Sequence, residues 1–326
     1  LHVGVLHPIL AIAAPSGRRR SSSEDSRLID ANSSAATTNL EDMQLATREA
    51  AREEEWRQEL RGVAAQALLK LTHKRHAREG LLAAGALFRL LELAASAEPP
   101  VVTLAVSALR SMSESEELRS RLIAEPGLLQ ALFNYTNAKA HFSGQKGADI
   151  TKHALIAILQ LSTETSASAD FLKLLPAMPL VSLCQGTLEE QHACARLFYL
   201  LGRPTGGGSQ SMQLSEAAAQ PLVVLGASEH TRVQLAAALA IERLAGHSEH
   251  SRRVLFDAGI TEPLTALLDS PEGAVQESAA MALRQLSLSK TRRTLLAQTA
   301  PMRALIATCA TELGRRTSVG ITALWA

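Results

Sequence analysis

Two histidine pairs are the first residues in this sequence that could do chemistry. His73 with His76, and His247 with His250, stand three residues apart, a spacing that places two imidazoles on one face of a helix. A zinc site needs about four ligands, and no acidic residue or cysteine completes a set at either place. We therefore expect all four histidines to lie exposed at helix ends, where a cationic imidazole suits a helix C-terminus.

Two glycine-rich stretches are candidates for phosphate-binding loops. Such a loop needs the pattern GxxxxGK[ST] after a strand, so that backbone amides surround the phosphates and the lysine reaches them. Neither SGQKGADITKH (143–153) nor RPTGGGSQS (203–211) has this pattern, and we expect both to be linkers. The motifs HExxH, GxSxG and DxD do not mark a site either. The sequence therefore predicts a protein that is not an enzyme, without catalytic, metal-binding or cofactor-binding residues.

The three cysteines, Cys184, Cys194 and Cys309, form no CxxC pair and are odd in number. This usage is typical of buried free thiols in a reducing compartment. We therefore expect an intracellular protein, with the cytoplasm favoured and an organelle matrix, mitochondrial or plastid, as the alternative. No apolar run approaches the ~20 residues that cross a bilayer, so no membrane span is predicted.

The chain begins with Leu rather than Met, and residues 1–14 are apolar. Three arginines at 18–20 and the serines Ser21, Ser22 and Ser23 follow. A secretory signal carries its positive charge before the apolar stretch, so this order does not fit one. The segment is similar to an organelle transit segment and would also suit basophilic kinases. We predict that residues 1–39 form an extension that is flexible or docked on a partner.

Composition favours a helical protein. Hydrophobic residues make up 46% of the 326 residues and aromatic residues only 3%. Helices packed through Leu and Ala suit this usage better than a β-sandwich, which is rich in Val, Ile, Thr and aromatic residues. The formal net charge is +1 at pH 7, so the chain lacks the basic field that nucleic-acid-binding proteins usually carry.

An internal repeat of about 42 residues predicts the architecture. One apolar column follows this interval: Leu90, Leu132, Leu180, Leu222, Leu264 and Leu305. A second apolar residue stands three positions later, which is one face of a helix: Leu93, Tyr135, Leu183, Leu225 and Leu267. Prolines before the column predict the first turn of this short helix: Pro179, Pro221 and Pro263. Glycines before the same helix predict a sharp turn: Gly85, Gly127 and Gly259.

A second column marks a longer helix in each repeat: Leu68, Leu109, Ile158, Leu197, Ile241 and Leu283. Each member lies in an amphipathic stretch that ends in Ser, Thr or Gly, residues that favour helix ends. Two steps are longer than the others. We expect the additional residues in loops at 141–149 (HFSGQKGAD) and 202–210 (GRPTGGGSQ), because each repeat needs its faces for its neighbours.

Each unit is thus predicted to contain a short helix, a second helix opened by Gly or Pro, and a longer third helix. The stretches LLAAGALFRLLELAAS (81–96) and LFDAGITEPLTALLDSPEGAVQESAAMALRQLSLS (255–289) closely resemble armadillo repeats. The resemblance covers about residues 60–312, and units near 150–200 are also similar to HEAT repeats. It implies an all-α fold, a right-handed α-solenoid of armadillo-like three-helix repeats, whose common property is a surface that binds partners.

This resemblance implies four segments: an N-terminal extension (1–39), capping helices (40–71), a solenoid of five fuller repeats plus a partial one (72–312), and a C-terminal tail (313–326). The capping segment is charged, and Glu53 and Arg57 have the favourable i, i+4 spacing. We expect its Trp56 and Leu60 to face inward, with an acidic docking helix as the alternative. Trp325 is expected either to hook into a partner or to pack on the last repeat.

In armadillo proteins the third helices line the concave face. The nuclear-import adaptors of the importin-alpha type place Trp two residues before the second-column residue and Asn two residues after it. Here the earlier positions hold Gln66, Ser107, Ile156, Ala195, Leu239 and Met281. The later positions hold Lys70, Ser111, Gln160, Tyr199, Arg243 and Gln285. Recognition of basic nuclear-import signals is therefore not expected.

The third helices carry cations instead, and Arg suits bidentate contacts with carboxylates or phosphates. The candidate partner-binding residues are Lys70, Arg110, Gln160, Arg196, Tyr199, Arg203, Arg243, Arg284 and Gln285. A contiguous positive stripe would support binding of an acidic or polar partner segment, whereas charges that alternate with Glu would contradict it. The alternative is that these are solvated positions of amphipathic helices.

The sequence thus predicts a non-catalytic scaffold or adaptor, a structural subunit of a larger assembly that binds protein partners through the solenoid groove and its terminal extensions. The alternative is an RNA-binding helical-repeat protein that uses Arg and Lys contacts with phosphates. RNA-binding repeats read bases with stacking aromatic side chains at fixed positions. The scarcity of aromatic residues argues against this alternative, and nucleic acid is not the expected partner.

Overall fold

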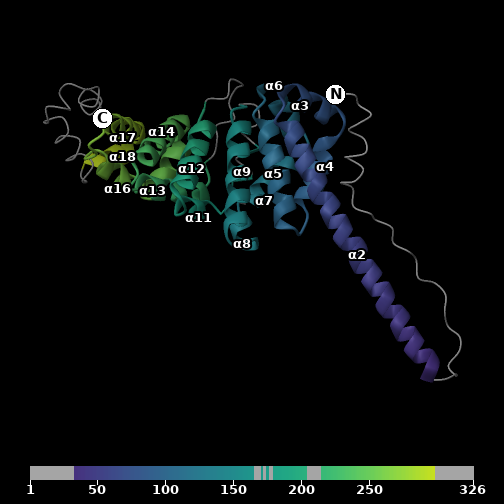
Figure 1. Cartoon of the computed structure of the whole chain (residues 1–326). Helices are drawn as coiled ribbons and strands as arrows, with labels where there is room; N and C mark the ends of the chain where they lie inside the picture. The colour runs from purple at the N-terminus through teal and green to yellow at the C-terminus, as the bar shows by residue number, and fades with distance from the viewer. Residues whose placement is uncertain (1–32, 165–169, 172–173, 176–178, 204–213, 298–326) are drawn as a thin grey trace. The chain divides into compact units, whose positions relative to one another are not determined.

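The structure is a computed structural model that describes residues 33–164, 170–171, 174–175, 179–203 and 214–297. Throughout these residues the regular elements are helical and no strand occurs (Figure 1). The chain forms two compact units, Leu1–Met112 and Ser113–Ala326. The predictions for Ser21 to Ser23, Leu305, Cys309 and Trp325 fall outside the described residues.

The first unit contains helices α2 (Ser33–Thr72), α3 (Arg75–Ala83), α4 (Ala86–Ala94) and α5 (Pro99–Ser113). Its apolar core begins at Ala64 and Ala65 in the last third of α2 and continues through Leu81 in α3. A single helix therefore spans the segment 40–71, where capping helices were expected. The division of the chain into four segments remains a prediction.

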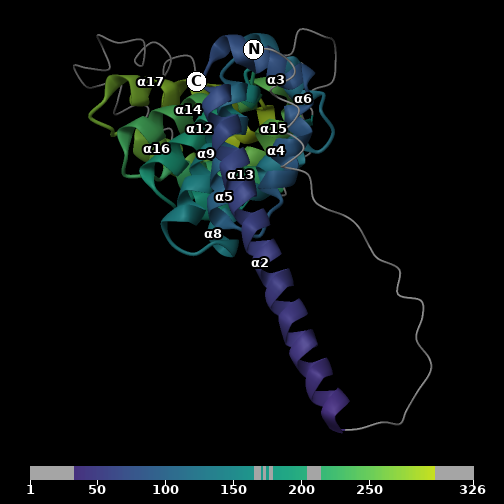
Figure 2. The same cartoon turned by 45° about the vertical axis from the view of Figure 1, so that its right-hand side comes forward.

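The outer part of α2 has no apolar cover in the first unit. Residues 47–59 are exposed, and Figure 2 shows this part of α2 running away from α3 and α4. Trp56 is 63% exposed, so the expectation that it faces inward is wrong: packing against α3 and α4 reaches only the later turns. The expected ion pair is confirmed, because Arg57 Nη2 lies 3.1 Å from Glu53 Oε2.

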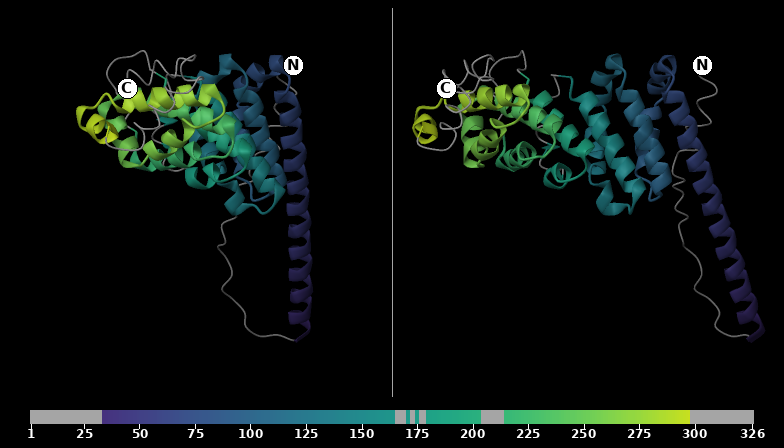
Figure 3. Two further views of the ribbon diagram at one scale, coloured as in Figure 1. Left: turned by 90° about the vertical axis from the view of Figure 1, so that its left-hand side faces the viewer. Right: turned by 60° about the vertical axis from the view of Figure 1, so that its left-hand side comes forward.

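The second unit contains α6 (Glu116–Ile123), α7 (Leu128–Tyr135), α8 (Ala138–His141), α9 (Gln145–Leu161), α11 (Leu180–Cys184), α12 (Leu188–Leu201), α13 (Glu216–Gly226), α14 (Thr231–His247), α15 (Glu249–Asp257), α16 (Thr261–Leu267), α17 (Gly273–Leu286) and α18 (Lys290–Ala297). The long helices α9, α12, α14 and α17 correspond to the predicted third helices. Helix α14 packs between α12 and α17, and the three lie side by side (Figure 3).

Both apolar columns are confirmed as the core. Every described member of the two columns is buried, from Leu68 and Leu90 in the first unit to Leu264 and Leu283 in the second. Complete burial of one such side chain contributes about 1.5–3 kcal/mol, so each member of the columns stabilises the fold. The predicted sharp turns are also confirmed, since φ is 73° at Gly85, 85° at Gly127 and 84° at Gly259.

The proline column is only partly confirmed. Pro179 is the residue before α11, and Pro263 lies in the first turn of α16, as predicted. Pro221 instead lies inside α13, which begins five residues earlier at Glu216. Proline spacing alone therefore places the start of this helix wrongly, because α13 already contains more than one turn before Pro221.

The loop expected at 141–149 is much shorter in the structure. Helix α8 ends at His141 and α9 begins at Gln145, so the additional residues form α8 and the first turn of α9 rather than a long loop. Gly147 permits this arrangement, because a Cβ atom there would lie 2.2 Å from the Phe142 carbonyl oxygen. The second expected loop, 202–210, falls almost entirely outside the described residues.

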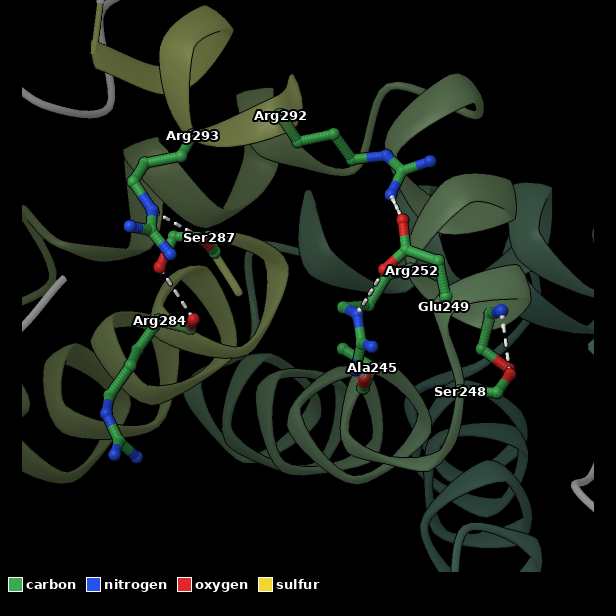
Figure 4. A network of polar contacts seen from close by, with 9 residues as sticks. Ala245, Ser248, Glu249, Arg252, Arg284, Ser287, Arg292 and Arg293 are labelled. Carbon is green, nitrogen blue, oxygen red and sulfur yellow. Dashed lines mark hydrogen bonds and ion pairs between the residues drawn. The ribbon is translucent and has the colours of Figure 1, made fainter. Parts of the chain in front are cut away.

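A recurrent arginine satisfies the C-terminal end of the third helices. The last carbonyl groups of a helix have no intrahelical partner. Four arginines of first helices donate to such carbonyls: Arg78 to Thr72 (2.5 Å), Arg119 to Ser113 (3.0 Å), Arg252 to Ala245 (3.0 Å) and Arg293 to Ser287 (3.1 Å). The last two contacts are drawn in Figure 4. Each bond ties a third helix to the helix that follows it.

A recurrent glutamine satisfies a backbone carbonyl group in the turn before the third helix. The side-chain amides of three glutamines donate to a carbonyl five or six residues earlier: Gln191 to Gly186 (3.1 Å), Gln234 to Ser228 (2.7 Å) and Gln276 to Ser270 (2.7 Å). The entry and the exit of the long helices are therefore fixed by side-chain donors as well as by apolar packing.

Arg119→Met should lower the free energy of unfolding by about 1–3 kcal/mol, because it removes charge-assisted bonds to the carbonyl of Ser113 and the hydroxyl of Thr163. Urea denaturation followed by circular dichroism measures the change. The matched control is Arg121→Met, since Arg121 is exposed on the same helix. Equal losses in the two variants would contradict the role assigned to Arg119.

Gly147→Ala should also destabilise the chain, by about 1–3 kcal/mol, because the added methyl group meets backbone atoms rather than a flexible side chain. This sign is opposite to the usual gain of about 1 kcal/mol for Gly→Ala inside a helix. Gly273→Ala is the control, since nothing lies within 4 Å of its added Cβ. If Gly147→Ala raised the free energy of unfolding, the Phe142 carbonyl group could not lie as close to Gly147 as the structure places it.

Candidate functional site

The candidate site is the partly exposed side of α12, α14 and α17 in the second unit, called here the third-helix face. It includes Arg203, which follows α12 two residues after the helix ends at Leu201. On α12 itself it contains His192, Arg196 and Tyr199, which are spaced four and three residues apart. This spacing places them on one side of the helix. Three of these four residues were expected from the sequence, and the structure aligns them.

Tyr199 and Arg243 form the best-defined contact of this face. The Arg243 guanidinium carbon lies 3.7 Å from the centre of the Tyr199 ring, and its Nη2 donates a hydrogen bond to the Tyr199 hydroxyl at 2.6 Å. Such stacking restricts the guanidinium to one plane, so less side-chain entropy is lost when it binds a carboxylate. The two helices approach closely here, because a Cβ atom on Gly202 would lie 3.0 Å from Arg243 Cβ.

A cluster of positive charge lies at the other end of the same two helices. His192 is partly exposed, and its pKa is lowered by burial and by the charges of Arg232 and Arg196. The two arginines are exposed, and within the described residues neither has a hydrogen-bond or ion-pair partner. The α12–α14 surface, defined by His192, Arg196, Tyr199, Arg203, Arg232 and Arg243, is therefore positively charged.

Charges alternate where α14 meets α17. Burial raises the pKa of Glu242, Glu277 raises it further, and Arg243 and Arg284 oppose this rise. The partly exposed apolar side chains of Leu239 and Met281 lie on the same two helices. Cations thus gather on α12 and at the start of α14, whereas the carboxylates of Glu242 on α14 and Glu277 on α17 alternate with Arg243 and Arg284, and a contiguous positive stripe remains a prediction.

The remaining candidate residues have separate positions. Lys70 is exposed on α2 and Arg110 is partly exposed on α5, both in the first unit. Gln160 on α9 accepts a hydrogen bond from the Ser113 hydroxyl. Gln285 lies beside Arg284 on α17, and both are partly exposed.

In the importin-alpha pattern the binding positions lie two residues before and two residues after the second-column residue. The structure exposes these positions only in part. The later position is partly exposed in α12, α14 and α17, as expected, but Ser111 in α5 is buried. The earlier position is buried in α12, where Ala195 packs inward.

Sequence reasoning missed His192 and Arg232. Both lie on the α12–α14 surface, but neither occupies the two positions that were considered. His192 precedes Arg196 by four residues and Tyr199 by seven, so extending the helical face toward the N-terminus would have found it. Arg232 lies in the first turn of α14, and only the packing of α14 against α12 brings it to His192.

The other candidates for chemistry have structural surroundings. His73, His76 and His250 are exposed as expected, whereas His247 is partly buried and its Nε2 lies 2.8 Å from the Gly202 carbonyl oxygen. Cys184 and Cys194 are free and buried, as predicted. Among the described residues no three His, Cys, Asp or Glu side chains come together as a metal site would require. None of the described helices is both long and apolar enough to cross a membrane.

Glu249 is the centre of a polar network beside this face (Figure 4). It accepts bonds from Arg292 of α18 and from Arg252 Nε at 3.0 Å. Partial burial acts to raise the pKa of Glu249, but hydrogen bonds from Arg292, Arg252 and Ser289 lower it overall. Arg292 binds Glu249, and Arg252 binds both Glu249 and the Ala245 carbonyl group at the end of α14. The network therefore holds α15 and α18 to their neighbours.

Comparison with known proteins identifies the fold. No family model matches the chain, and no curated protein matches it. A designed armadillo repeat protein is 26% identical, covers 70% of this chain and 94% of its own, and superposes with a TM-score of 0.55. A second designed armadillo repeat protein, solved in complex with the peptide (KR)4, is 24% identical with the same coverages and a TM-score of 0.57.

An engineered protein gives a similar match, with 22% identity, coverage of 71% of this chain and 93% of its own, and a TM-score of 0.54. These matches and the helical architecture agree with the repeat predicted from the sequence. The chain is therefore an armadillo-like repeat protein with an all-α armadillo repeat fold.

The pKa of His192 gives a test of the charge cluster. Its pKa in the folded chain is lowered from the ordinary value of 6.5, so the unfolded chain binds more protons below that value and stability falls as the pH falls. His192→Gln should remove this loss, so its free energy of unfolding relative to the unsubstituted chain should increase between pH 7.5 and pH 5.5. Urea denaturation at both pH values measures the difference.

Nuclear magnetic resonance of the imidazole gives the control for this test. Arg232→Gln should raise the pKa of His192, because it removes one of the two positive charges that lower it. A His192 pKa at or above 6.5 in the unsubstituted chain, or no response to Arg232→Gln, would contradict the cluster.

Proposed function

We propose that this chain is a non-catalytic protein-interaction scaffold or adaptor whose third-helix face binds an acidic or polar segment of a partner protein. The observation that carries the proposal is the α12–α14 surface, where Arg196 and Arg232 are exposed and Arg243 is held flat against Tyr199. Armadillo repeats expose such side chains on rows of packed helices, which suits the binding of extended segments.

The chemistry of this surface favours carboxylates. A guanidinium group binds a carboxylate through two parallel hydrogen bonds, and such charge-assisted bonds are about twice as strong as neutral ones. Arg196 and Arg232 can make them without losing an internal ion pair. The designed relative was solved with the basic peptide (KR)4. In this chain the α12–α14 surface would repel a basic peptide, so we propose a ligand of the opposite charge.

The wider role in this proposal is that of a structural subunit of a larger assembly, with the terminal extensions as additional contacts. The exposed Trp56 on the outer part of α2 supports such a contact, because a large aromatic side chain left in water is a common anchor in interfaces. The buried free thiols of Cys184 and Cys194 support a reducing, intracellular compartment, with the cytoplasm favoured over an organelle matrix.

An unbiased peptide library selected on the full chain tests this proposal. Selected peptides should be acidic, and hydrogen exchange should show protection of α12, α14 and α17 when they bind. Arg196→Glu should weaken their binding at least tenfold, since it replaces an attractive charge by a repulsive one. The control is Arg253→Glu, on an exposed residue of α15 outside this face.

Single-stranded RNA is the comparison ligand. Binding of a random 20-nucleotide RNA that weakens steeply with salt, together with failure to select any peptide, would favour the phosphate-binding alternative. Protection confined to other helices would contradict the choice of surface.

A further inference from the structure

The third-helix face has two chemically different parts. The α12–α14 surface is positive, with Arg196 and Arg232 exposed beside His192. The α14–α17 surface, defined by Leu239, Glu242, Glu277, Met281 and Arg284, combines two aliphatic side chains with two carboxylates and one guanidinium. A segment that crosses the three helices therefore meets cations first and an aliphatic region next.

The three helices run in the same direction, so equivalent residues lie side by side. Near the start of α12 and α14 the Ser228 hydroxyl donates to Gln191 at 2.8 Å, and near their ends Arg243 contacts Tyr199. In the same way, a Cβ atom on Gly246 near the end of α14 would lie 3.9 Å from the Gln285 side chain near the end of α17, as one on Gly202 would lie 3.0 Å from Arg243. Leu239 and Met281, which occupy equivalent positions, are thus neighbours across α14 and α17.

The distance between neighbouring helices determines how many residues separate the two recognised side chains of the ligand. Packed helices lie about 8–10 Å apart, and an extended chain advances about 3.3 Å per residue. One step from the α12–α14 surface to the α14–α17 surface therefore corresponds to about three residues of an extended segment. The carboxylates of Glu242, which is partly buried, and of Glu277, which is exposed, disfavour a second acidic residue over the aliphatic part.

We propose that the third-helix face selects partner segments in which an acidic residue and a large aliphatic residue are about three positions apart. The acidic side chain binds Arg196 and Arg232, and the aliphatic side chain packs on Leu239 and Met281. This inference rests on the proposed function, since it assumes that an extended protein segment occupies this face. It adds the pattern that such a segment must carry.

Synthetic peptides of 12 residues, with a Glu pair and one Leu in a Gly/Ser background, test the pattern. The separation between Glu and Leu runs from one to six residues in both orders, because the direction of the segment is not fixed. Fluorescence anisotropy with the full chain measures the affinity. The peptide with a separation of about three should bind at least fivefold more tightly than those with one or six, in one of the two orders.

Two sets of variants separate the two parts of the face. The double variant Arg196→Glu/Arg232→Glu should weaken every Glu-containing peptide at least tenfold. Met281→Gln should weaken only the peptide with the best separation, to the level of a peptide without Leu. Leu239→Gln is the second aliphatic variant, and Arg253→Glu is the control. Circular dichroism and thermal unfolding establish that each variant is folded.

The outcomes distinguish this inference from the proposed function. Affinity that depends on acidic residues but not on the separation would overturn the inference and leave the proposed function intact. The same holds if none of these peptides binds while library-selected peptides bind through α12, α14 and α17. Failure of the library selection as well would overturn both.

Discussion

The ends of the long helices impose the constraint on which the rest of this structure depends. Carbonyl groups in the last turn of a helix have no partner within that helix, and leaving one buried and unpaired costs about 1–3 kcal/mol. Here an arginine from the following helix supplies the donor, as Arg119 does for Ser113 and Arg252 for Ala245. The same bond that completes one helix therefore sets the start of the next.

The candidate site is a consequence of this arrangement. Because α12, α14 and α17 are held side by side in one direction, residues far apart in the sequence form a continuous surface. Tyr199 and Arg243 are 44 residues apart, yet they stack and share a hydrogen bond. The charge of that surface does not follow from the nearly neutral composition of the chain, because packing brings cations of α12 and α14 together and leaves Glu242 and Glu277 where α14 meets α17.

The sequence predicts this fold well where one physical rule acts alone. Apolar residues must be buried and glycine tolerates positive φ, so both columns and turns such as Gly85 are correct. Expectations fail where two effects compete. Pro221 favours a first turn, but α13 begins five residues earlier at Glu216, and Ala195 stands at a position compared with the importin-alpha pattern, but its small apolar side chain is buried. The pairing of His192 with Arg232 could not be predicted, since it depends on the packing of two helices.

The bonds made by the capping arginines also bear on how such a chain changes in evolution. Arg252 and Arg293 stand at equivalent places in consecutive repeats, and each reaches back across a repeat boundary. Duplication or deletion of one such repeat as a whole would keep each of these arginines beside the third helix that it caps. A break within a repeat would separate a helix from its donor. Repeat number can therefore vary in whole units, and each unit added would widen the third-helix face by one row.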